Sequence, residues 1–225
     1  MNNGTVASYI NNEPHGEDAF VIRELSDTEN LDSVLDGVSR CEGAYASRFT
    51  SQMLQDSSIK SFKDLVDALE QANSILFGSG RGRNLLTTVS AAFKIGDELH
   101  VINLGDSPVF LIRGGEIREL STIAKSAIFR SALVGAVGLR EDFGYDYTKV
   151  SLQRRDKLVL ATDGLTNNIS PEEVAECVQS SADPQGAISA LKGLISEKKR
   201  LHKGREEYFG TFRLDDETVI IRYFD

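Results

Sequence analysis

The sequence has few cysteines that could crosslink the fold, and it has no long apolar run that could anchor it in a membrane. Only two of its 225 residues are cysteines, and Cys41 and Cys177 lie far apart and match no zinc or redox spacing. This argues against a disulfide framework and indicates two small hydrophobic side chains in a reducing compartment. No apolar run approaches the roughly 20 residues of a membrane helix, and no basic segment followed by an apolar one opens the chain. We therefore predict a cytoplasmic protein with no membrane partner.

The chain also lacks an excess of positive charge. It carries 34 acidic and 25 basic residues, which gives a formal net charge of -9. A negative surface repels phosphodiester backbones, so we expect no nucleic-acid partner. Cations are the more natural ligands, although an acidic excess by itself also serves only to keep a protein in solution.

Length and composition indicate a single folded domain. An apolar content of 40% in 225 residues suits a core that needs no metal staple and no obligatory oligomer. No linker, internal repeat or low-complexity tract divides the chain. We predict a single domain over residues 1–225, and a monomer.

Strands and helices are predicted in groups. Stretches rich in apolar and β-branched residues predict strands at 5–10, 19–23, 33–38, 87–93, 99–104, 109–113, 157–161 and 218–223. The Gly114-Gly115 pair predicts a hairpin within residues 107–119. Apolar stripes and capping residues predict helices over 42–54 and after Ser61, Ser170 and Asp183, whereas residues 197–207 are predicted to be a loop. Helix pairs that separate strand groups favour an α+β fold in which helices cover antiparallel sheets.

Acidic residues recur where predicted strands end or begin. Asp36, Asp106, Asp163 and Asp215 each follow an apolar run, and the Glu17-Asp18 pair precedes a strand. A single Asp-Gly after a strand is common turn chemistry. Several of them brought together would instead form the oxygen-rich shell that Mg²⁺ and Mn²⁺ prefer.

The order of these motifs resembles a known family. The series runs Glu17-Asp18, Asp36-Gly37, Thr87-Thr88, Gly105-Asp106-Ser107, Thr162-Asp163-Gly164 and Asp215-Asp216. It is similar to the type 2C metal-dependent serine/threonine protein phosphatases, and above all to their small bacterial branch. The resemblance implies an antiparallel β-sandwich flanked by helices on both sides, in four layers. It also implies hydrolysis of phosphoserine and phosphothreonine on a partner protein.

The resemblance assigns roles to individual residues. It implies five metal ligands: Asp36, Gly37 through its carbonyl, Asp163, Asp215 and, for a looser third ion, Asp106. Asp36 would bridge two Mn²⁺ or Mg²⁺ ions, and Glu17 and Asp18 would orient bound waters. A hydroxide that bridges the two cations would attack phosphorus in line.

Two positions depart from the family pattern. Glu13 stands where relatives carry an arginine that grips the phosphate, and Val38 stands where they carry a histidine. His15 and Arg40, which lie close to the motifs in sequence, are the candidate replacements in substrate binding.

These departures keep other functions open. One is a pseudophosphatase, or phosphoprotein-binding regulatory module, without efficient turnover. Another is a plain metal-binding scaffold. The segment 120–140, where the family places a variable flap, is short and predicts an open site.

Overall fold

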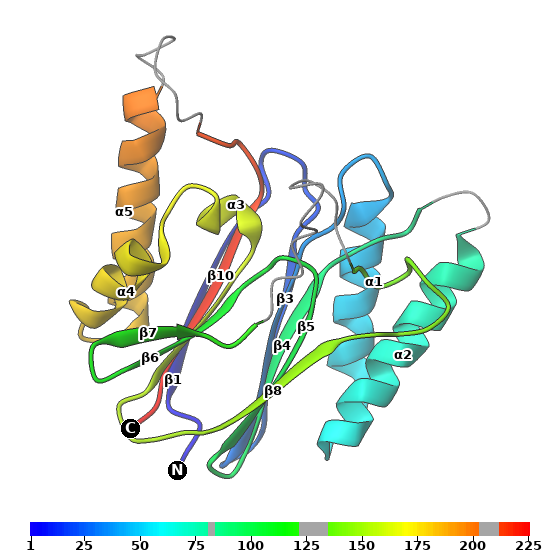
Figure 1. The fold of residues 1–225 in the computed structure, drawn as a ribbon, viewed down its shortest axis with the longest axis horizontal. Coiled ribbons are helices and arrows are strands. Elements are labelled where there is room, and N and C mark those ends of the chain that lie inside the picture. The colour runs from blue at the N-terminus through cyan, green and yellow to red at the C-terminus, as the bar shows by residue number, and fades with distance from the viewer. Residues whose placement is uncertain (81–83, 122–134, 203–211) are drawn as a thin grey trace.

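The computed structural model describes residues 1–80, 84–121, 135–202 and 212–225, and these form two five-stranded antiparallel sheets (Figure 1). The first sheet has the order β1 (Thr5–Asn11), β10 (Glu217–Tyr223), β9 (Lys157–Ala161), β6 (Val109–Arg113) and β7 (Glu116–Glu119). The second has the order β2 (Ala19–Ser26), β3 (Glu29–Leu35), β4 (Val89–Ile95), β5 (Glu98–Leu104) and β8 (Asp146–Ser151).

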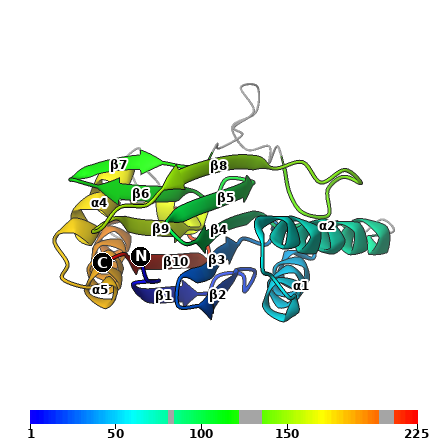
Figure 2. The ribbon, with the colours of Figure 1, turned by 90° about the horizontal axis from the view of Figure 1, so that it is seen from below.

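Helices cover the outer face of each sheet. The long helices are α1 (Gly43–Asp56) and α2 (Phe62–Ser79) beside the second sheet, and α4 (Pro171–Gln179) and α5 (Pro184–His202) beside the first (Figure 2). The short helix α3 (Asp163–Thr166) follows β9 directly. The result is the predicted α+β sandwich in four layers.

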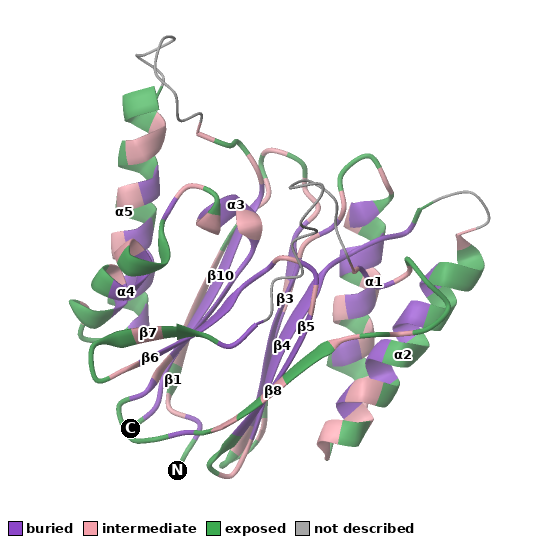
Figure 3. Cartoon of the chain, viewed as in Figure 1, coloured by how far each residue is buried: buried purple, intermediate pink, exposed green. Residues whose placement is uncertain are grey.

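Three hydrophobic clusters fill the spaces between these layers, and the three central strands of each sheet are buried along most of their length (Figure 3). Alternation along the strands separates the clusters, because successive side chains point to opposite faces of a sheet. On β10, Val219 and Ile221 pack toward α4 and α5, whereas Ile220 joins the core between the two sheets. Val34 and Ala92 reach the same inter-sheet core from the second sheet.

A buried ion pair also joins the two sheets. Arg222 on β10 is fully buried, and its Nε and Nη2 atoms donate to the two carboxylate oxygens of Asp32 on β3 at 2.6 and 2.8 Å. Its Nη1 atom lies 2.8 Å from the Glu24 carboxylate on β2. Removing one partner of such a pair is strongly destabilising, because a charge is left in the core.

Local signals explain several helix boundaries. The α4 capping box is complete, because Ser170 Oγ accepts from the Glu173 amide and the Glu173 carboxylate accepts from the Ser170 amide. Ser61 caps α2 through its side chain, whose Oγ accepts from the amide of Asp64 at 3.2 Å.

Other sequence predictions were displaced or wrong. The strand predicted at 33–38 lies at Glu29–Leu35, and β8 was not predicted. The predicted loop over 197–207 is helical as far as His202, while 203–207 lie outside the described residues. Most of the expected flap, residues 122–134, also lies outside them. Among the helices that the structure describes, none has the length and apolar content to cross a membrane.

Candidate metal and phosphate site

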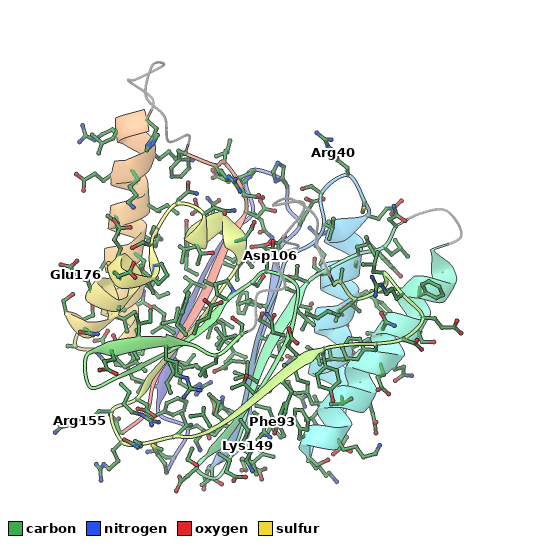
Figure 4. The ribbon with its side chains drawn as sticks, in the orientation of Figure 1. Arg40, Phe93, Asp106, Lys149, Arg155 and Glu176 are labelled. Carbon is green, nitrogen blue, oxygen red and sulfur yellow. The ribbon has the colours of Figure 1, made fainter. Side chains whose placement is uncertain are left out.

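Strand register brings the predicted acidic residues to one end of the sandwich. In the second sheet Ala19 pairs with Leu35, so the residues just before β2 and just after β3 are neighbours. In the first sheet Val219 pairs with Ala161, which places the start of β10 beside the end of β9. The end of β5 lies at this edge as well, and Asp106 is seen there in Figure 4.

Asp36 lies at the centre of this cluster. Burial raises the pKa of its carboxyl well above the ordinary value, and the negative charges of four other aspartates raise it further. These neighbours come from both sheets and are Asp18, Asp163, Asp106 and Asp215. The Asp36 carboxyl therefore sits in a concentration of negative charge that favours a proton or a cation.

Two threonines fix the backbone of Asp36. The Asp36 amide donates to Thr88 Oγ1 at 3.1 Å, and its carbonyl accepts from the Thr88 amide at 2.8 Å. Thr87 Oγ1 donates to the same carbonyl at 2.9 Å. The Thr87-Thr88 motif thus positions the aspartate without using its carboxylate.

Asp163 is the first residue of α3. Its carboxyl hydrogen-bonds to that of Asp36, and its Oδ2 accepts from Asn167 Nδ2 at 2.8 Å. Burial and the charge of Asp215 raise the pKa of Asp163, although both hydrogen bonds oppose the rise. The Asp36–Asp163 contact links the two sheets at the site.

Asp18 is buried beneath the cluster, with 3% of its surface exposed. Its Oδ2 accepts from Thr162 Oγ1 at 2.8 Å and from Thr218 Oγ1 at 2.7 Å, whereas its Oδ1 is buried without a hydrogen-bond partner. Burial, with smaller effects from Asp216 and Asp215, raises the pKa of Asp18 to about 7. A buried oxygen without a partner suits a bound water or ion.

Asp216 organises the loop that carries Glu17, and the sequence analysis missed it. Its buried carboxylate accepts from the His15 amide at 2.9 Å and from the Glu17 amide at 2.6 Å. The signal was present in the consecutive acids Asp215-Asp216, but sequence alone does not show which of the two turns inward.

Gly37 allows three backbone segments to meet. Its amide donates to the Glu17 carbonyl at 3.1 Å, and a Cβ at this position would lie 2.7 Å from that oxygen and clash with the Gly43 carbonyl group. The Glu17 carboxylate accepts from Ser39 Oγ close by. Gly37 therefore has no room for a side chain, which accounts for glycine after Asp36.

The two candidate substrate residues differ in position. His15 Nδ1 lies 3.0 Å from Asp215 Oδ1, and this hydrogen bond raises the pKa of the exposed His15 ring. Arg40 lies in the loop before α1 with a φ of 66°, and in Figure 4 its side chain points outward from that loop.

The donor set fits hard divalent cations. The clustered side chains offer carboxylate oxygens, which these ions prefer as ligands. A positive charge would give Asp18 Oδ1 a partner and would relieve the repulsion between the carboxylates around Asp36. As the described side chains stand, no three His, Cys, Asp or Glu residues have the spacing of a closed metal site. Part of the reason is visible at Asp215, whose Oδ1 contacts His15 and the Asp216 amide. The carboxyls lie near one another but do not surround a common point, so a bound cation would draw them closer together.

Solved structures with the same architecture are PPM-type phosphatases. The PPM Ser-Thr phosphatase MsPP from Mycobacterium smegmatis, in complex with cacodylate, superposes with a TM-score of 0.78 at 22% identity, over 98% of each chain. PppA, a key regulatory component of T6SS in Pseudomonas aeruginosa, gives a TM-score of 0.80 at 22% identity, over 98% of this chain and 97% of that one. The fold is therefore that of a type 2C phosphatase, a class that is metal-dependent.

Residues 41–220 match the family described as Stage II sporulation protein E (SpoIIE), and the chain belongs to this family. Curated relatives agree. The Serine/threonine phosphatase stp of Listeria welshimeri is 23% identical over 85% of this chain and 94% of its own length. The Probable protein phosphatase 2C 80 of Arabidopsis thaliana is 26% identical over 92% of this chain, and the match covers 54%, about half, of the plant protein.

Proposed function

We propose that this chain is a cytoplasmic, monomeric protein phosphatase that removes phosphate from phosphoserine and phosphothreonine on a partner protein. The observation that carries the proposal is the convergence of four aspartates, from both sheets, around Asp36. Phosphate monoesters hydrolyse extremely slowly without catalysis, so the site must supply large charge stabilisation. The names of the relatives, which are serine/threonine and type 2C phosphatases, support this choice of reaction.

The proposed cofactor is a pair of Mn²⁺ or Mg²⁺ ions, and Asp106 would help to hold a looser third ion. Asp36, the Gly37 carbonyl, Asp163 and Asp215 would hold the ions. When bound, such a pair neutralises phosphate charge and supplies an activated water.

The remaining residues would orient the reactants. Thr87 and Thr88 hold Asp36, and Asp216 holds the loop that presents Glu17 and Asp18. Glu17 and Asp18 would position water by accepting hydrogen bonds. The raised pKa of His15 favours its positive form nearer neutral pH, which suits contact with a phosphate dianion at the exposed rim. Arg40 is a second candidate for that contact.

The test measures hydrolysis of p-nitrophenyl phosphate and of a phosphothreonine peptide, in Mn²⁺ and in EDTA. We expect Mn²⁺-dependent turnover that falls by at least about 10²-fold in Asp36→Asn and Asp163→Asn, since each removes a ligand charge. The matched control is Asp27→Asn, an exposed aspartate in the β2–β3 turn, which should retain wild-type activity.

Two results would contradict the proposal. One is turnover that is equal in EDTA and in Mn²⁺. The other is the absence of turnover on both substrates by a protein that demonstrably binds the metal, which would favour a phosphoprotein-binding module.

A further inference from the structure

A groove runs along the first turns of α1, beside the candidate site. It has a volume of about 540 Å³, within the roughly 300–1,000 Å³ of pockets that hold small ligands. Its walls include Glu17 and Gly43, and both of these residues meet Gly37 in the closely packed backbone next to Asp36. The groove therefore borders the backbone that carries Asp36.

Aromatic side chains form its other wall. Tyr45 and Phe49 stack with ring centroids 5.9 Å apart and an interplanar angle of 14°, and both line the groove. Tyr45 is 53% exposed, which is high for a large aromatic side chain. Exposed rings of this kind, with arginine nearby, are enriched where proteins bind partners.

Arg48 makes the groove a preformed feature. Its Nη2 donates to the Gly16 carbonyl at 3.0 Å, which ties α1 to the loop that carries Glu17. The guanidinium has further N–H groups that can donate to carbonyls of a bound chain. A site whose walls are already fixed loses little entropy on binding.

We propose that Tyr45 and Phe49 are specificity-determining residues that bind an apolar or aromatic side chain flanking the phosphorylated residue of the substrate. This inference rests on the proposed phosphatase function. An extended chain advances about 3.3 Å per residue, so residues next to the phosphorylated one run past the walls that border the site. Glu17 lines the groove and lies in the loop that Asp216 holds at the candidate site, so the groove is the neighbouring surface that a peptide bound at that site can reach.

The test uses wild-type protein, Tyr45→Ala, Tyr45→Phe and Phe77→Ala, all in Mn²⁺. Phe77 is the matched control, because it is 43% exposed on α2 and does not line the groove. The substrates are p-nitrophenyl phosphate, an alanine heptapeptide with a central phosphothreonine, and a series in which one phenylalanine occupies successive positions on either side.

We expect phenylalanine at one or more positions to raise kcat/KM about tenfold over the alanine peptide, equivalent to about 1.4 kcal/mol. Tyr45→Ala should abolish that gain through KM, whereas Tyr45→Phe, which keeps the ring, and Phe77→Ala should preserve it. All four proteins should hydrolyse the alanine peptide with the same kcat/KM, because that peptide offers the groove no large apolar or aromatic side chain.

The outcomes separate this inference from the proposed function. No gain from phenylalanine at any position, or a gain that survives Tyr45→Ala, overturns the inference and leaves the phosphatase intact. If wild-type protein that binds the metal hydrolyses neither p-nitrophenyl phosphate nor any of the phosphothreonine peptides, the proposed function fails, and fluorescence anisotropy with the same peptides decides the inference. Tyr45-dependent binding then supports the groove, and Tyr45-independent binding overturns it.

Discussion

Replacing Asp18 with asparagine should stabilise the metal-free protein at alkaline pH. The two side chains have nearly the same shape, and the asparagine oxygen can still accept from Thr162 and Thr218. What disappears is a buried charge, in a site where one carboxylate oxygen has no partner. The energetic effect depends on how far the folded state shifts the protonation of Asp18.

The direction and size of the effect follow from the pKa. Folding raises the pKa of Asp18 from an ordinary 3.8 to about 7, so the folded state binds more protons than the unfolded state between those values. The free energy of unfolding therefore falls as pH rises from about 4 to about 7, and the loss is complete above that window. The two pKa values set an upper limit of about 4 kcal/mol on the loss from Asp18 alone.

Urea unfolding in EDTA at pH 5 and pH 8 measures this loss. For the wild type, the free energy of unfolding should drop between the two conditions by up to about 3 kcal/mol more than for Asp18→Asn, because pH 5 to pH 8 covers about two pH units of the window. Asp27→Asn, at an exposed turn, should keep the wild-type drop. A wild-type drop equal to or smaller than that of Asp18→Asn would refute the reasoning.

Other perturbations test the metal ligands, the backbone and the core. In differential scanning fluorimetry, Mn²⁺ should raise Tm more at pH 8 than at pH 5, because the ion competes with protons for carboxyls such as that of Asp36. Asp36→Asn should remove most of this rise in Tm. Gly37→Ala should lower Tm by several degrees in thermal circular dichroism, because its Cβ meets backbone, whereas Gly193→Ala on α5, which meets no atom within 4 Å, should leave Tm unchanged or higher. Asp32→Ala should lose about 3–5 kcal/mol in urea unfolding by leaving Arg222 buried without its main partner, and a loss under about 1 kcal/mol would contradict that role for the ion pair.

Local sequence signals predicted the elements that local chemistry determines. The capping box at Ser170 marked the start of α4, and the apolar run Lys157–Ala161 matched β9 at both ends. Prediction failed where contacts between residues distant in the sequence determine the local structure. The strand predicted at 33–38 begins instead at Glu29 and includes Asp32, whose buried partner Arg222 lies 190 residues away in the sequence.

Edge and surface elements were missed for a related reason. In β8, exposed Tyr147 and Lys149 alternate with half-buried residues, so the strand has no strong apolar pattern. The end of α5 is rich in charge, but Lys198 pairs with Glu173 on α4 across the helix interface.

The site was only partly readable in the sequence. Its aspartates were found because they follow or precede strands, and the structure gathers Asp18, Asp36 and Asp163 at one end of the sandwich. The support from Asp216 and the groove beside Arg48 needed three-dimensional information, because loop folding and helix placement create them. The roles assigned to individual ligands stay predictions.

The carboxylate cluster straddles the seam between the sheets. Asp18, Asp36 and Asp106 belong to the second sheet, and Asp163 and Asp215 belong to the first. The separation of the two halves is therefore set by side-chain volume in the core beneath them, at residues that never touch a cation or a phosphate. A conservative change of side-chain volume in that core should therefore alter the affinity for Mn²⁺ while every aspartate of the cluster stays the same.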